Sequence, residues 1–140
     1  MDIRKLEHRI MSTNKNTEDY VSFETAKLLK EKGFDEICYT AYETITNAHE
    51  VEQCSISNWG RLNQVKRPTL QMAMKWLRKV HNIDIEVRTH YLSHLKQNDV
   101  RYYSGKILKG SEDVIHTIYS KDTYEEVCEL AIKYSLENLI

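Results

Sequence analysis

The stretch from Thr69 to Tyr91, TLQMAMKWLRKVHNIDIEVRTHY, decides the fold because it changes from helical to strand periodicity at one point. Thr69 is a suitable N-cap, and Asn82 tolerates the left-handed conformation that ends a helix. From Ile83 to Tyr91 apolar and polar residues alternate, which predicts a strand with one face in water. In the first half, at about 100° per residue, one apolar sector contains Leu70, Ala73, Met74, Trp76, Leu77 and Val80.

Two more strands and a helix are predicted after this stretch. Asn98-Asp99 favours a turn before VRYYSGKIL (100–108), and KGSED (109–113) favours another before VIHTIY (114–119), so we expect a three-stranded antiparallel meander. Asp122 with Glu125 three positions later matches a capping box and predicts the start of the last helix. That helix should run almost to Ile140, with helical spacing of Tyr124, Val127, Leu130, Ala131 and Tyr134.

The region before Thr69 predicts one helix and a β-hairpin. Ser22 is a suitable N-cap, and Gly33 should end the helix in a Schellman motif in which Phe34 folds back on Leu29. The segments ICYTAYETI (37–45) and VEQCSIS (51–57) favour paired strands. The polar residues from Asn58 to Pro68 are predicted to form a loop.

The predicted order of elements is α-β-β-α-β-β-β-α. We expect the α+β class, with an antiparallel sheet of about five strands and about three helices packed mainly on one face. Residues 1–19 are charged and polar, and we interpret them as an N-terminal arm with room for a short helix. Residues 20–140 are predicted to form a single α+β domain.

Composition favours a folded, cytoplasmic protein. The chain has 140 residues, of which 41% are hydrophobic and 29% charged, as in ordinary globular domains. The three cysteines, Cys38, Cys54 and Cys128, are widely spaced and odd in number, which argues against a disulfide framework. No apolar run approaches the roughly 20 residues that span a bilayer, and the N-terminus lacks a signal-peptide core. We therefore expect no membrane partner.

Charge is distributed unevenly although the net charge is only −1. The formal charge is −4 over residues 1–52, +6 over 53–83, +2 over 84–110 and −5 over 111–140. The basic segment has no acidic residue between Glu52 and Asp84. Its cations are Arg61, Lys66, Arg67, Lys75, Arg78 and Lys79.

These six cations and Trp59 form the candidate binding face. Cations that converge can bind phosphate groups, and a tryptophan in a loop can stack on a base or anchor a partner. The alternative is a solvated helix face whose cations complement the helix C-terminus, with Trp59 folded over the sheet as part of the core. The acidic terminal segments could also neutralise the basic region.

No catalytic, metal or cofactor motif is present in the sequence. His90 and His94 have a spacing that suits metal binding on a helix, but along the predicted strand they would be about 13 Å apart. There is no CxxC pair, glycine-rich phosphate loop or G-x-S-x-G motif. We therefore predict a non-enzymatic protein without a metal or cofactor.

Tyrosine is frequent, with nine in the chain. An exposed row of tyrosines on a sheet is a good protein-binding surface, although tyrosine also simply suits strands. The predicted strands contain Tyr39, Tyr42, Tyr91, Tyr102, Tyr103 and Tyr119.

Three segments carry a resemblance to a known family: YVSFETAKLLKEKGFDE (20–36), RPTLQMAMKWLRKVHNIDI (67–85) and TYEEVCELAIKYSLENLI (123–140). Together they resemble small uncharacterised proteins of Bacteroidetes bacteria and their phages and prophages. That family has no assigned activity, so the resemblance implies no functional residue. It implies a phage or prophage context and a bacterial host cell. The chain departs from the family pattern in its N-terminal arm and at residues 47–66 and 93–120, where functions of individual members would lie.

The resulting functional hypothesis is a small interaction or accessory protein, associated with a phage or prophage, that binds an unknown protein partner. One alternative is a nucleic-acid-associated accessory protein that binds phosphates through the basic 61–79 region. Another is a small-molecule-binding protein that counters host defence.

Overall fold

The computed structural model describes residues 19–44, 51–53, 64–92, 100–111 and 113–140. The predicted N-terminal arm, apart from Asp19, lies outside these residues. The elements are α2 (Phe23–Glu31), β1 (Thr40–Glu43), β2 (Val51–Gln53), β3 (Gln64–Lys66), α3 (Leu70–His81), β4 (Ile83–Leu92), β5 (Val100–Lys109), β6 (Val114–Lys121) and α4 (Tyr124–Asn138).

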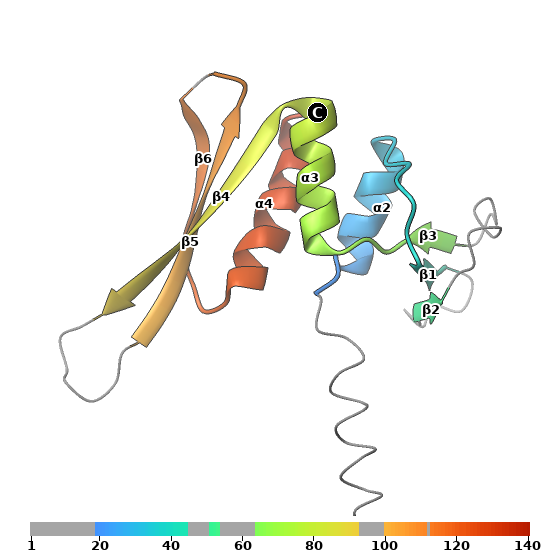
Figure 1. Cartoon of the computed structure of the whole chain (residues 1–140), viewed down its shortest axis with the longest axis horizontal. Coiled ribbons are helices and arrows are strands. Elements are labelled where there is room, and N and C mark those ends of the chain that lie inside the picture. Colours follow the sequence, from blue (N-terminus) through green and yellow to red (C-terminus); the bar gives the residue numbers. More distant parts are fainter. Residues whose placement is uncertain (1–18, 45–50, 54–63, 93–99, 112) are drawn as a thin grey trace, which may run out of the picture.

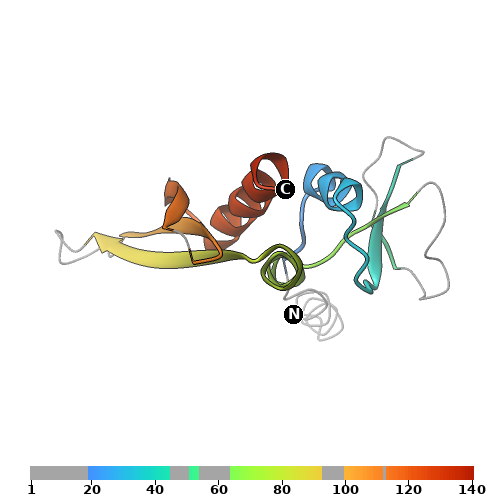
Figure 2. The same cartoon turned by 90° about the horizontal axis from the view of Figure 1, so that it is seen from above.

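The helices lie between two antiparallel sheets, which gives the molecule an elongated shape (Figures 1 and 2). On one side is the meander β4-β5-β6, and on the other is the small sheet β2-β1-β3. Helix α4 packs on all three strands of the meander, and it also contacts α2 and α3. Helix α2 contacts β3 of the small sheet. The buried side chains of all these layers form one hydrophobic core.

The α+β class is confirmed and the predicted helices and strands follow one another in the predicted order α-β-β-α-β-β-β-α, with two differences in the strands, one of which adds a strand before α3. The strands form two three-stranded sheets instead of one sheet of about five. In addition, residues 64–66, which were predicted to be loop, form β3 and pair with β1. This strand is only three residues long with a single buried side chain, Val65, so it has no detectable periodicity.

The predicted caps of α2 are confirmed. Ser22 Oγ accepts a hydrogen bond from Thr25 N at 3.2 Å. At the other end Gly33 has φ +88°, and Phe34 N donates to Leu29 O at 2.9 Å, which completes the Schellman motif.

Helix α3 also begins and ends as predicted, but one residue of its apolar sector is not buried. Thr69 Oγ1 accepts from Met72 N at 3.1 Å, and Asn82 has the left-handed conformation with φ 56°. Val80 is exposed although its direction lies within the apolar sector, between those of Trp76 and Ala73; it belongs to the last turn of the helix. The predicted polar stripe, with Lys75, is exposed.

The predicted cap of α4 was wrong by one residue. Thr123 is the N-cap, and its Oγ1 accepts from Glu126 N at 3.1 Å. The spacing of a capping box occurs twice here, in Asp122 with Glu125 and in Thr123 with Glu126. The local sequence therefore does not determine which residue is the N-cap.

The meander is regular between β4 and β5 and irregular at β6. Ten residue pairs join β4 and β5 without interruption. The pairing of β5 with β6 shifts twice, and Ser120 near the end of β6 has φ 42°. The helix-facing alternation predicted for β4 holds from Ile83 to Val87, whereas Tyr91 at its far end is exposed.

Candidate functional site

The structure does not bring the six predicted cations together as one site. Trp59 and Arg61 lie outside the described residues. Lys75, Arg78 and Lys79 are exposed on α3, as predicted.

Arg67 has a structural role instead of facing solvent with the others. Its guanidinium carbon lies 3.9 Å from the centre of the Tyr20 ring and 5.3 Å from that of Tyr42. Its backbone N donates to Thr40 O at 2.9 Å. This half-buried arginine therefore joins the start of the domain to the small sheet through cation–π contacts.

Lys66 approaches the cations of α3, but an acidic residue lies between them. Lys66 Nζ donates to the backbone oxygen of Glu36 at 2.8 Å. Glu36 also lines a small cavity of about 130 Å³ together with Lys75 and Lys79. The acidic N-terminal segment thus reaches the basic face, which lowers its attraction for an anion.

A different surface stands out on the meander. Among the described residues, no helix covers the side of the β4-β5-β6 sheet that faces away from α4 (Figures 1 and 2). We call this side the open face. Since Ile83, Ile85 and Val87 pack into the core, the alternate residues of β4 and their partners on β5 lie on the open face. Its residues are Asp84, Glu86, Arg88, His90 and Leu92 of β4, Val100, Tyr102, Ser104, Lys106 and Leu108 of β5, and Thr117 and Tyr119 of β6.

The centre of the open face is ordered by cross-strand contacts. The rings of His90 and Tyr102 are directly opposite and stack at 4.7 Å with an angle of 14°. His90 Nε2 is 2.7 Å from Ser104 Oγ, which in turn lies opposite Arg88 in the register. These contacts fix the orientation of the His90 imidazole. The side chain therefore loses less conformational entropy when a ligand binds.

Large apolar side chains are exposed around this centre. The exposed fraction is 73% for Tyr119, 54% for Val100 and 48% for Leu92. Val100 and Leu92 are opposite each other at the far end of the hairpin. The open face therefore combines apolar area with oriented polar groups, as binding surfaces do.

The pair of His90 and Ser104 has the distance of a nucleophile and its base, but not the rest of a catalytic site. Within the described part of the chain, no carboxylate hydrogen-bonds to the second ring nitrogen of His90. What the contacts do show is that His90, Tyr102 and Ser104 order one another on the open face.

The described cysteines and acids indicate no reactive centre. Cys38 and Cys128 are buried, and burial raises the pKa of each thiol to about 11, so neither is a thiolate at neutral pH. In the residues that the structure describes, no three His, Cys, Asp or Glu side chains are placed to hold a metal ion. None of the described helices has the length and apolar character to cross a membrane.

Comparison of the chain with family models, curated proteins and solved structures finds no match. The open face was not identified from the sequence as a set of residues. Its signal was the number of tyrosines in the predicted strands, but only the register of β4 with β5 shows which of them share a face.

Proposed function

We propose that the protein is a non-enzymatic interaction protein and that its open face binds a partner protein. The observation that carries the proposal is the uncovered side of the meander, with Tyr119, Val100 and Leu92 exposed around the stacked pair of His90 and Tyr102. The opposite side of the same sheet is packed against α4.

The charge of the open face favours a protein over a polyanion. The acids Asp84 and Glu86 balance the bases Arg88 and Lys106, so the formal charge of these four residues is zero. Glu86 and Lys106 are also directly opposite in the register, where opposite charges stabilise a strand pair. Tyrosine and arginine are the residue types that protein interfaces favour.

The dimensions of the face predict a small interface. Three strands about 4.8 Å apart and eight to ten residues long cover roughly 400–500 Å² of sheet. A standard interface buries about 800 Å² on each partner. The open face therefore suits a transient complex, or one in which the partner also contacts the end of the hairpin.

Site-specific photocrosslinking tests this proposal. A photoreactive phenylalanine analogue replaces Tyr119 in one version of the full chain and Tyr39 in another; Tyr39 is 68% exposed and precedes β1 of the small sheet, so it is a matched control. Irradiation in a Bacteroidetes lysate should give a crosslinked partner from position 119 and not from position 39. The crosslink should disappear when Val100→Lys is added. Equal crosslinking from both positions, or none from position 119, would refute the assignment.

The phage or prophage context supports an accessory role in the cytoplasm of a bacterial host. Its support is the resemblance of the three segments quoted above, so we propose that the partner is a host or phage protein of that compartment. Crosslinking in infected and uninfected cells distinguishes these two sources.

A second candidate function is nucleic-acid binding through the basic region. The observation in its favour is that Lys75, Arg78 and Lys79 are exposed together on α3, although Glu36 beside them lowers their attraction for an anion. If these lysines contact phosphates, binding to DNA or RNA should weaken steeply with salt and be lost when Lys75, Arg78 and Lys79 are changed to Glu. Absence of binding by the wild-type chain near 50 mM salt, at roughly the micromolar concentrations of non-specific binding, would exclude it.

A further inference from the structure

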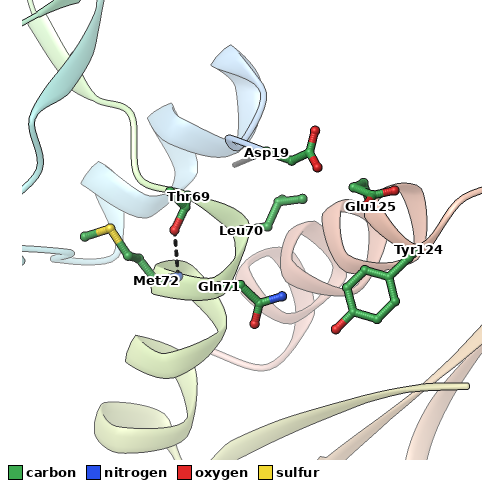
Figure 3. Close-up of a pocket in the computed structure, with 7 residues that line it drawn as sticks. All are labelled: Asp19, Thr69, Leu70, Gln71, Met72, Tyr124 and Glu125. Atoms are coloured by element: carbon green, nitrogen blue, oxygen red, sulfur yellow. Dashed lines mark hydrogen bonds between the residues drawn. The ribbon is translucent and has the colours of Figure 1, made fainter. Parts of the chain in front are cut away.

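A cavity at the junction of α3 and α4 lies apart from both surfaces described above. It has a volume of about 400 Å³, within the range of small-molecule pockets. The first turn of α3 contributes Leu70, Gln71 and Met72, and the first turn of α4 contributes Tyr124 and Glu125 (Figure 3). Thr69, the N-cap of α3, and Asp19, which precedes α2, complete the lining. We call this cavity the junction pocket.

Two amides in the first turn of α3, at the edge of the pocket, are already paired within the protein. Leu70 N donates to Asp19 O at 2.9 Å, and Met72 N donates to Thr69 Oγ1 at 3.1 Å. At the start of α4, Glu126 N donates to Thr123 Oγ1 at 3.1 Å. These paired amides are not available to an anion, and the carboxylates of Asp19 and Glu125 in the lining would repel one.

The charges of the pocket favour a cation. Asp19 and Glu125 contribute two carboxylates, and no salt bridge within the described residues neutralises either of them. Two helix N-termini oppose these charges with only about half a positive charge each. The net potential of the lining is therefore negative.

The remaining walls suit the carbon chain and the flat face of an organic cation. Leu70 gives an apolar wall, and the ring of Tyr124, which packs edge to face with Tyr103 at 6.4 Å, is partly exposed at the rim (Figure 3). A tyrosine face attracts an ammonium or guanidinium group, and the Gln71 side chain can accept one of its hydrogen bonds. The volume is far larger than a bare metal ion needs.

We propose that the junction pocket binds an alkyl ammonium or guanidinium group, held between the carboxylates of Asp19 and Glu125 and the ring of Tyr124. The cavity, its aromatic wall and its uncompensated carboxylates together specify this class of ligand. The group could belong to a free amine or to an arginine side chain of a protein, and the test separates these sources.

Titration of the full chain with agmatine, followed by amide NMR, tests the proposal. Agmatine should shift the amide signals of Gln71, Tyr124 and Glu125 saturably, whereas glutarate, a dianion of similar length, should not. The double change Asp19→Asn with Glu125→Gln should weaken binding at least fivefold, the effect of about 1 kcal/mol. Glu126→Gln is the matched control, since it removes a neighbouring charge that does not line the pocket, and it should change affinity less than twofold.

Tyr124 gives a second test that does not depend on charge. Tyr124→Phe keeps the ring and should bind agmatine like the wild type, and Tyr124→Leu should weaken binding about two- to fivefold. If an arginine peptide with acetylated and amidated ends binds as tightly as agmatine, the natural ligand is an arginine side chain of a protein. If agmatine binds and the peptide does not, the natural ligand is a free amine. Shifts that do not saturate, equal response to glutarate, or equal loss with Glu126→Gln would overturn the proposal.

Discussion

Replacement of Gly105 by alanine tests how closely α4 packs on the meander. An added Cβ at this position would lie 2.5 Å from Val127 Cγ1 and 3.5 Å from Glu86 O. Carbon atoms in contact are normally about 3.5–4.0 Å apart, so the sheet and α4 would have to separate by roughly 1 Å. Val127 is fully buried and β-branched, so its χ1 angle in the helix offers little room to move.

The expected cost follows from two opposing effects. Overpacking of a core destabilises a protein by about 1–3 kcal/mol. Removal of a glycine from a strand interior returns about 0.5–1 kcal/mol. We expect Gly105→Ala to lower the free energy of unfolding by about 1–2 kcal/mol, measured by urea denaturation with the fluorescence of the buried Trp76 and far-UV circular dichroism.

A double-mutant cycle shows whether the contact with Val127 is the cause. Val127→Ala alone should also destabilise, because it removes two buried methyl groups at about 0.8 kcal/mol each and leaves a cavity. In the double variant the new methyl at residue 105 fills part of that cavity, so the loss should be at least about 1 kcal/mol smaller than the sum. A Gly105→Ala variant as stable as the wild type, or additive losses, would refute the close packing.

Three further predictions concern buried polar groups. Burial, with a smaller effect of Lys109, lowers the pKa of His81 in the folded protein below 6.5. When the pH falls through 6.5, His81 is therefore protonated in the unfolded chain before it is protonated in the folded one, and the free energy of unfolding decreases. His81→Gln should reduce this decrease, measured by urea unfolding between about pH 7.5 and 5.5. In a Cys54→Ser background, Cys38 and Cys128 should not react with a thiol reagent at about pH 8 until urea unfolds the chain, and rapid reaction of the native protein would contradict their burial. Glu129 Oε1 accepts from Thr25 Oγ1 at 2.6 Å and from Ser22 N at 3.1 Å, so Glu129→Ala should cost about 1–3 kcal/mol, whereas alanine at an exposed glutamate of α4 should cost little.

The sequence predicted those parts of the fold that depend on local chemistry. The caps at Ser22, Thr69 and Asn82 were identified because each places a specific residue type at a helix end. The meander was identified from alternation and turns. Strand β3 and the separation into two sheets were missed because they depend on contacts between distant segments, such as that of Tyr42 with Val65.

The candidate site was harder to predict for the same reason. The charge of Arg67 was visible in the sequence, but its contacts with Tyr20 and Tyr42 were not. Likewise, nothing local shows that Glu36 lies beside Lys75. A pattern along one helix gives its face, whereas the neighbours of that face come from other parts of the chain.

The position of α4 has a consequence for how the chain folds during synthesis. This helix follows the other described elements in the chain, yet it contacts β4, β5, β6, α2 and α3, and Leu139 O just after it accepts a hydrogen bond from Lys109. The meander and α2 therefore leave the ribosome before the helix that buries their apolar sides exists. Until residues 124–140 are made, the nascent chain exposes the future core to chaperones and proteases, so premature termination after β6 should yield degraded protein instead of a smaller folded one.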